Sequence, residues 1–324
     1  MNLNYLLDKI AMAEFQVYPF KHIRIDNFFS DKHFADILAS PEIHIPKSKS
    51  DHELFENLDA AGYKVIPFPG CITDRQKYMK WHKLRNKAGK THPTCEGFGV
   101  ALRLFQTKTK IITDVLDFFS SAEFNSAIAN RFRIDIEECN IDGGIQKYLD
   151  GYEISPHPDI RRKAATFMVN INPNPKSEEC EHHTHYLELI SSRKYIYEFW
   201  EGNSQVDRAW LPWSWAKSCM TQSANNSIVI FSPTNTSLHA VKANYDHLCF
   251  QRTQLYGNIW YKEANTIGSV EWQGLDVLSN LQTNQQKLEI GFRNKIKKLT
   301  PNFLLRKYHE LRAKEKVGKR NIDG

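Results

Sequence analysis

The chain has 324 residues, of which 41% are hydrophobic, 12% are aromatic and only 15 are glycine. This profile is typical of a globular protein with a substantial core, and it excludes disordered, collagen-like and low-complexity chains. The formal net charge is +6, from 43 Lys and Arg against 37 Asp and Glu. Residues 287–324 hold 12 basic and 4 acidic residues, so the first 286 hold the remaining 31 basic and 33 acidic ones. The basicity therefore belongs to the C-terminal tail, and the rest of the chain is nearly neutral.

Cysteine spacing and hydropathy indicate the compartment in which we expect the protein. The six cysteines lie 24 or more residues apart and form no Cys-x-x-Cys pair, which favours reduced thiols over a disulfide framework or a zinc site. The first 15 residues lack the basic start of a signal peptide, and no apolar run approaches the roughly 18 residues of a membrane helix. We therefore expect a soluble, cytoplasmic protein.

The N-terminal part of the sequence predicts a few helices around a long polar segment. Apolar residues at helical spacing predict a helix over residues 1–15, and polar-apolar alternation predicts a strand over 21–26. A serine at position 30 caps a predicted helix that ends at 38. Residues 40–96 are polar and irregular, so we expect mostly loop, acting as a lid or substrate wall. Core-spaced apolar residues predict a further helix over 110–129.

After residue 130 the sequence changes to short β-type runs separated by turn residues. Asp150-Gly151 between two of these runs is a hairpin signal, because tight hairpin turns need positive φ. Nine short strands in about 130 residues predict a sandwich or jelly roll with flanking helices. The predicted strands are 132–136, 145–149, 152–155, 165–171, 186–190, 194–199, 227–231, 238–241 and 250–261.

A His-Pro-Asp sequence directly follows the predicted strand 152–155. Residues i and i+2 of an extended segment project to the same face, so His157 and Asp159 would converge on one point. Pro158 reinforces this by favouring an extended His157. By itself, the motif is better explained as a surface turn with an incidental acid.

Two later residues strengthen the interpretation as a metal site. His239 begins a predicted strand 80 residues after Asp159, and Arg252 lies inside the next apolar strand. Two neutral imidazoles and one carboxylate form the facial triad of non-haem Fe(II) oxygenases, with positions left open for a chelating cosubstrate and O₂. A buried arginine is costly unless paired, and a carboxylate held by two hydrogen bonds would satisfy it.

The order and spacing of these residues resemble the Fe(II)/2-oxoglutarate-dependent dioxygenase superfamily, in particular its prolyl-hydroxylase-like branch. The resemblance covers most of residues 18–262. It implies a double-stranded β-helix core in which His157, Asp159 and His239 hold Fe(II) and act as the catalytic site. It also implies that Arg252 binds 2-oxoglutarate, which is converted to succinate and CO₂ while O₂ supplies one atom to the substrate. The stretches that carry the resemblance are residues 19–29, 144–159 and 165–173, His239-Ala240-Val241, and Arg252.

Some positions depart from the family pattern. Many relatives carry a Ser two residues after the arginine and a Tyr on the strand after His-x-Asp, where this chain has Gln254 and Asn170. Their amides are donors that suit a carboxylate, so both are candidate cosubstrate contacts, as is the hydroxyl of Tyr148. Halogenating relatives have a small residue at the position of Asp159, so the carboxylate favours hydroxylation over chlorination.

Two other clusters have competing interpretations. Glu181-His182-His183-Thr184-His185 has the composition of a zinc site, but it follows a predicted solvent loop, and we favour a loop at the mouth of the substrate pocket. A hydrolytic reading of this cluster lacks a well-placed acid. Trp200, Trp210, Trp213 and Trp215 either wall a pocket or pack over the end of the barrel, and packing is the favoured interpretation.

The alternative to the leading function depends on the basic tail. Residues 287–324 carry apolar side chains at helical spacing between basic ones, which favours a docked, solvated helix over a membrane-surface or nucleic-acid contact. We divide the chain into an N-terminal helical and loop support region (1–129), a catalytic core (130–262) and a basic helical extension (263–324). The predicted substrate is a small molecule or a peptidyl residue. The alternative is a non-catalytic β-barrel binding or assembly protein that acts through its basic C-terminal helices.

Overall fold

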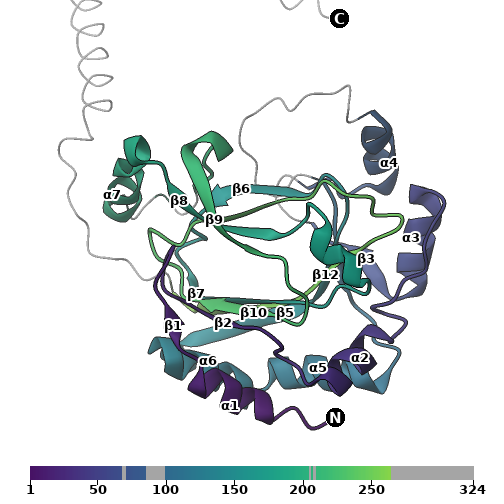
Figure 1. The fold of residues 1–324 in the computed structure, drawn as a ribbon, viewed down its shortest axis with the longest axis horizontal. Helices are drawn as coiled ribbons and strands as arrows, with labels where there is room; N and C mark the ends of the chain where they lie inside the picture. Colours follow the sequence, from purple (N-terminus) through teal and green to yellow (C-terminus); the bar gives the residue numbers. More distant parts are fainter. Residues whose placement is uncertain (68–70, 85–98, 204–205, 207–208, 264–324) are drawn as a thin grey trace, which may run out of the picture. The chain divides into compact units, whose positions relative to one another are not determined.

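The computed structural model describes residues 1–67, 71–84, 99–203, 206 and 209–263 (Figure 1). Residues 264–324 lie outside this part, and with them the predicted basic extension. Twelve strands occur in the described part. They are β1 (Phe15–Gln16), β2 (His22–Ile25), β3 (Tyr63–Val65), β4 (Ala101–Leu104), β5 (Cys139–Tyr148), β6 (Glu153–His157), β7 (Lys163–Asn170), β8 (Thr184–Leu189), β9 (Ala216–Gln222), β10 (Ile228–Phe231), β11 (His239–Lys242) and β12 (Arg252–Tyr261).

The strands form two antiparallel sheets that face each other. The larger has the order β1-β2-β10-β7-β12-β5-β4-β3, and the smaller has the order β6-β11-β8-β9. From β5 to β12 the chain passes repeatedly between the sheets, with β5, β7, β10 and β12 in the larger and β6, β8, β9 and β11 in the smaller. This path is that of a jelly roll, or double-stranded β-helix. The predicted fold class, mostly β with flanking helices around a jelly-roll core, is confirmed.

Helices cover the outer face of the larger sheet (Figure 1). Helices α5 and α6 contact β5 and β7, and α1 packs on α6. Aromatic rings fill this layer, with Phe167 of β7 lying 5.7 Å from Phe119 and 5.2 Å from Phe124 between ring centroids. The inner face of the same sheet is left to line the space between the sheets. The helices are α1 (Tyr5–Met12), α2 (Asp31–Leu38), α3 (Asp51–Ala60), α4 (Arg75–Leu84), α5 (Lys110–Ser120), α6 (Ala122–Phe132) and α7 (Tyr195–Gly202), and short 3₁₀ turns occur at Ile136–Glu138, Pro175–Glu179, Ser191–Arg193 and Trp213–Trp215.

The segment predicted to be mostly loop contains α3, β3 and α4, so that prediction is wrong in this region. Ser50 caps α3 by accepting a hydrogen bond from the backbone N–H of Glu53, whose carboxylate in turn accepts one from the N–H of Lys49. This is close to a capping box, a local signal visible in the sequence. Leu54 and Leu58 are buried and form the apolar face of the helix. The many charged residues around them make the segment polar on average, so its composition did not indicate a helix.

Two predicted strands are wrong. Residues 132–136 form the connection between the last residue of α6 and the first residue of a 3₁₀ turn, and residues 194–199 lie mainly in α7. In α7, Ile196 and Tyr197 pack against the cluster around Leu187 and Leu189, and the Tyr197 hydroxyl accepts a hydrogen bond from the backbone N–H of Leu189. Aromatic and β-branched residues gave the segment strand propensity, but its tertiary contacts favour a helix. The predicted helix over 110–129 is two helices, because Ser121 ends α5 and caps α6.

The turn at Asp150-Gly151 does not close a hairpin. Gly151 has φ +79°, as the turn signal required, and the N–H of Tyr152 bonds to the carbonyl of Leu149 at 3.0 Å. The strands on either side belong to different sheets, however, because β5 pairs with β4 and β12 while β6 pairs with β11. The turn is therefore a corner that carries the chain from one sheet to the other.

The described cysteines and helices agree with two further observations from the sequence. Five cysteines are described, and all are free thiols: Cys71, Cys139, Cys180, Cys219 and Cys249. Within the described ranges, every helix is too short or too polar to cross a lipid bilayer.

Candidate functional site

Two histidines face each other on paired strands of the smaller sheet. His157 ends β6 and His239 begins β11, and the two residues are partners in the antiparallel register. Their ring centroids lie 4.2 Å apart. Asp159 follows two residues after β6, and ligand atoms from the three side chains all lie within 4.8 Å of one another. The structure thus brings together the three residues that the sequence suggested as metal ligands.

Main-chain carbonyls orient both imidazole rings. Nδ1 of His157 donates to the carbonyl of Ser155 at 2.9 Å, and Nδ1 of His239 donates to the carbonyl of Ser237 at 3.1 Å. Because a carbonyl only accepts, each Nδ1 carries the proton and each Nε2 keeps a free lone pair. These Nε2 atoms lie 3.7 Å from Oδ1 and Oδ2 of Asp159, respectively. Burial lowers the pKa of His239 to about 3, so its ring is in the neutral form that binds metals.

The Asp159 carboxylate is buried and is held by two further side chains. Nζ of Lys163 lies 2.7 Å from Oδ1, and the hydroxyl of Thr166 donates to Oδ2 at 3.1 Å. Burial by itself raises the pKa of Asp159, but Lys163 and the two histidines outweigh it and hold the pKa well below its usual range. Asp159 has φ +74°, so the chain turns here. The convergence of His157 and Asp159 therefore depends on this turn and not on strand alternation.

A cavity of about 490 Å³ lies between the two sheets and is lined by all three of these side chains. Arg252 and Thr184 line the same cavity, so the candidate metal ligands and the arginine face one common space. Side chains from both sheets contribute to its wall, as a jelly roll arranges them. The volume is within the range of small-molecule sites.

Arg252 is a buried cation that carries a free hydrogen-bond donor. The residue is 3% exposed, its Nη2 donates to the hydroxyl of Thr184 at 3.0 Å, and its Nη1 is buried without a partner. The guanidinium carbon lies 4.4 Å from the ring centroid of Tyr148. No described carboxylate lies within ion-pair distance of it, and burial lowers its pKa. Such a group is a ready site for an anionic ligand.

The three other predicted cosubstrate contacts are placed differently from one another. Tyr148 and Gln254 line the cavity, whereas Asn170 does not. The Tyr148 hydroxyl donates to Gln146, so its contact with Arg252 is made by the ring face. Asn170 donates its amide hydrogens to two main-chain carbonyls at 2.8 and 3.2 Å and accepts a bond from Gln254 at 3.0 Å. Asn170 therefore braces Gln254.

The histidine-rich cluster is more buried than a solvent loop would be. His182 is fully buried and His183 is 6% exposed, so a solvent loop is wrong for these two residues. Glu181 pairs with Asn244, and β8 begins at Thr184. The His182 and His183 rings lie against each other, with their centroids 4.4 Å apart. Within the residues that the structure describes, these histidines do not form a group with metal-ligand spacing.

The tryptophan-rich stretch serves in both of the ways considered. Trp210 lines the cavity. Trp213 donates from its indole nitrogen to Glu153 at 3.0 Å, and Trp215 packs with it against the smaller sheet. Trp200 lies on α7, where the Arg161 guanidinium stacks over its ring at 4.2 Å. Packing over the barrel thus accounts for three of the four residues.

Sequence reasoning missed several residues of the site. Lys163 and Thr166, which hold Asp159, carry no motif of their own, although a lysine four residues after a candidate ligand was visible. Thr184 lay inside the histidine cluster and was not considered separately. A second group with metal-ligand spacing, Asp51, His82 and His247, was also missed because its members are far apart in the sequence.

A jelly roll with two histidines and one carboxylate at the mouth of an internal cavity defines a candidate non-haem metal centre. The donor set fits Fe(II), since both Nε2 lone pairs and the carboxylate face one another. No family model matches the sequence, and no curated protein matches it.

Among solved structures, the comparison finds several oxygenases at low sequence identity. A prolyl-4-hydroxylase from Pseudomonas putida is 10% identical, with 80% of this chain and 99% of that chain covered and a TM-score of 0.41. A prolyl hydroxylase from Trichoplax adhaerens, in complex with a hypoxia inducible factor oxygen degradation domain peptide fragment, is 12% identical, with 82% and 92% covered and a TM-score of 0.38. An oxidoreductase of the 2OG-Fe(II) oxygenase family from Burkholderia pseudomallei is 10% identical, with 68% and 95% covered and a TM-score of 0.28.

Proposed function

We propose that the chain is an Fe(II)- and 2-oxoglutarate-dependent oxygenase. It hydroxylates an aliphatic C–H bond of an amino acid, a peptidyl residue or another small metabolite, and it releases succinate and CO₂. His157, Asp159 and His239 hold the metal, and Arg252 holds the cosubstrate. Residues 130–262 form the catalytic core, and residues 1–129 support it.

The observation that carries this proposal is the position of Arg252. A buried guanidinium with a free Nη1 lies in the same cavity as three convergent metal-binding side chains. A metal chelator that also bears a distant carboxylate would satisfy both groups at once, and a 2-oxo dicarboxylate is such a molecule. The neighbouring Thr184 hydroxyl fixes the guanidinium plane.

Each residue of the candidate site has a defined task in this proposal. The imidazoles bind through Nε2, while their Nδ1 protons stay on main-chain carbonyls. Thr166 orients the Asp159 carboxylate, and the two sheets exclude water from the reacting bond. Bound Fe(II) supplies the oxidising chemistry with O₂ and 2-oxoglutarate. The aromatic wall at Trp210 is placed to contact the substrate.

Anaerobic addition of Fe(II) and 2-oxoglutarate tests the proposal. Chelation of iron by the cosubstrate is expected to give a weak visible charge-transfer band in the wild-type protein. The band is expected to disappear in His157→Ala and to persist in the matched control His44→Ala, because His44 is exposed and belongs to no metal-capable group. Arg252→Leu is expected to need more 2-oxoglutarate for the same band.

Two results would contradict the proposal. One is a folded wild-type protein that shows no band, and the other is a band that survives His157→Ala. If the band behaves as expected, succinate formation during metabolite profiling would identify the substrate. The alternative function through the basic tail rests on residues 287–324, outside the described part, and stays a prediction.

A further inference from the structure

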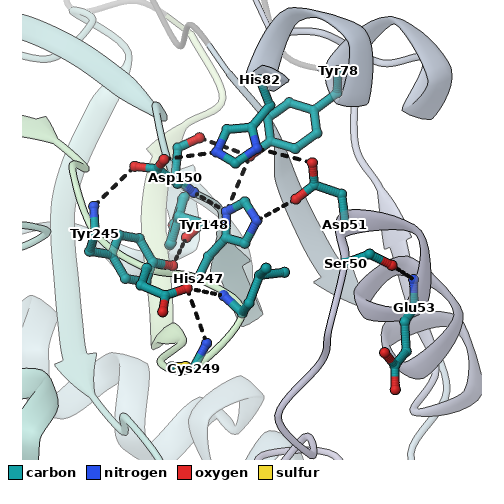
Figure 2. Close-up of polar contacts among 12 residues, drawn as sticks. Ser50, Asp51, Glu53, Tyr78, His82, Tyr148, Asp150, Tyr245, His247 and Cys249 are labelled. Carbon is teal, nitrogen blue, oxygen red and sulfur yellow. Dashed lines mark hydrogen bonds and ion pairs between the residues drawn. The ribbon is translucent and has the colours of Figure 1, made fainter. Parts of the chain in front are cut away.

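Four side chains from separate parts of the fold form a second histidine-carboxylate cluster (Figure 2). Asp51 begins α3, His82 lies on α4, Asp150 lies at the corner between β5 and β6, and His247 lies between β11 and β12. The His82 ring lies between the two carboxylates. Its Nδ1 is 3.0 Å from Oδ2 of Asp51, and its Nε2 is 2.9 Å from Oδ2 of Asp150. The ring thus joins helix α4 to the jelly roll.

The hydrogen bonds define the charge of His82. An ionised carboxylate only accepts, so both ring nitrogens donate and His82 is an imidazolium. Burial lowers the pKa of His82, but the bonds to Asp150 and Asp51 outweigh it and raise the pKa to about 9. Burial likewise raises the pKa of Asp51, and the bonds from His247 and His82 bring it below its usual range. Tyr78 stacks on His82, and the ring centroid of His247 lies 4.6 Å from that of His82.

The same bonds disfavour a metal ion in this cluster, although Asp51, His82 and His247 have ligand atoms within 4.8 Å. The backbone N–H of Asp150 donates to Nδ1 of His247 at 3.0 Å, so Nδ1 is unprotonated. The proton of the neutral ring is then on Nε2, which donates to Oδ1 of Asp51 at 2.7 Å. A metal ion would need the lone pair of that Nε2.

A short chain of contacts leads from this cluster to Arg252. Oδ1 of Asp150 accepts a hydrogen bond from the backbone N–H of Tyr245 at 3.0 Å, while Oδ2 faces His82. The Tyr245 hydroxyl accepts from the backbone N–H of Arg252 at 3.1 Å and donates to the carbonyl of Tyr148. Arg252 and Tyr148 are register partners, and the ring of Tyr148 lies against the guanidinium. Tyr245 therefore joins the ends of the two strands that present the arginine.

We propose that the His82 imidazolium is a latch that fixes Asp150 and, through Tyr245, positions Arg252 for the dicarboxylate cosubstrate. His82 and Asp150 are positioning residues, since neither lines the cavity. The latch rests on the proposed function, and it adds a dependence of cosubstrate affinity on a charge that lies on helix α4. Loss of that charge removes one of the interactions that hold the Asp150 carboxylate and loosens the Tyr245 bridge.

The latch is tested by measuring 2-oxoglutarate binding to the full-length protein with Mn²⁺ in place of Fe(II), by calorimetry. His82→Gln removes the charge and is expected to weaken 2-oxoglutarate binding about tenfold at neutral pH. Its affinity for Mn²⁺ alone is expected to stay unchanged. Wild-type affinity should fall by a similar factor as the pH rises past about 9, whereas His82→Lys should retain it, because a lysine keeps its charge there. His52→Gln, at an exposed site on α3, is the matched control.

The outcomes separate the latch from the proposed function. If the wild type does not bind 2-oxoglutarate, or Arg252→Leu binds it equally well, both inferences fail. If Arg252→Leu loses binding but His82→Gln binds like the wild type, the latch is wrong and the proposed function stands. If His82→Gln loses Mn²⁺ and 2-oxoglutarate affinity together, the effect is a general loosening, which also overturns the latch.

Discussion

Replacement of Lys163 by methionine is expected to tighten the binding of a divalent ion. The Lys163 ammonium lies 2.7 Å from Oδ1 of Asp159, one of the three candidate metal ligands. A metal ion and the ammonium are both cations that need the same carboxylate, so they compete for it. Methionine retains much of the lysine stem and adapts to irregular spaces, so the cavity wall is preserved.

The magnitude follows from the burial of this ion pair. The side chains of Lys163 and Asp159 are 16% and 4% exposed, so water screens them only in part. A hydrogen bond to a charged group contributes about 1.5–3 kcal/mol to stability. At about 1.4 kcal/mol for each tenfold change, its removal predicts Mn²⁺ binding that is roughly 10- to 100-fold tighter. The metal-free protein loses the same interaction, so its free energy of unfolding should fall by about 1.5–3 kcal/mol.

Calorimetric titration with Mn²⁺ near neutral pH measures the first effect, and urea unfolding in a chelator measures the second. Lys110→Met is the matched control, because Lys110 makes a 2.7 Å ion pair with Asp114 at an exposed site. That variant should bind Mn²⁺ like the wild type. Unchanged or weaker Mn²⁺ binding by Lys163→Met would refute the reasoning and show that the lysine supports the carboxylate as a ligand.

Three further predictions concern other parts of the fold. Thr184→Val removes the acceptor that orients the Arg252 guanidinium and should raise the KM for 2-oxoglutarate about fivefold with little change in kcat, as measured by succinate formation; an unchanged KM would argue against this role. Gly257→Ala places a Cβ 2.2 Å from the Phe167 ring and should lower the free energy of unfolding by about 1–3 kcal/mol in urea; wild-type stability would show that the ring shifts at no cost. The stability that His82 contributes should be fully present below about pH 6.5, the ordinary histidine pKa, and should be lost as the pH rises through about 9, because the folded state raises its pKa. The free energies of unfolding of the wild type and His82→Gln, measured in urea, should therefore converge across this range. A constant difference between the two would contradict the assignment.

Local sequence signals predicted much of the jelly roll. The runs at 165–171, 227–231 and 250–261 are β7, β10 and β12, and the continuous apolar character of β10 reflects burial on both faces. Ser30 caps α2 as expected, with its hydroxyl accepting from the backbone N–H of His33. Strand β9 was missed because its residues, Ala216–Gln222, are mostly polar and are held by pairing with β8. Short-range patterns contain no information about such a partner.

Some residues of the candidate site could likewise be predicted from the sequence, and others could not. His157, Asp159 and His239 were found because two lie in one short motif and the third begins a strand. The bond between Asp51 and His247 joins residues 196 positions apart, and only the folded chain brings them together. The corner at Asp150-Gly151 shows most clearly the limit of prediction from the sequence. The turn itself was predicted, but the two strands that it joins belong to different sheets and form no hairpin.

The carbonyls of Ser155 and Ser237 have a consequence for how the protein tolerates mutation. Each is a main-chain group two residues before its histidine, so replacement of either serine side chain leaves the acceptor in place. In sites where a carboxylate side chain orients the histidine, a single substitution can remove that support. Here the ring orientation is a property of the strand path itself. The support of each Nδ1 proton therefore does not depend on which side chain stands at position 155 or 237.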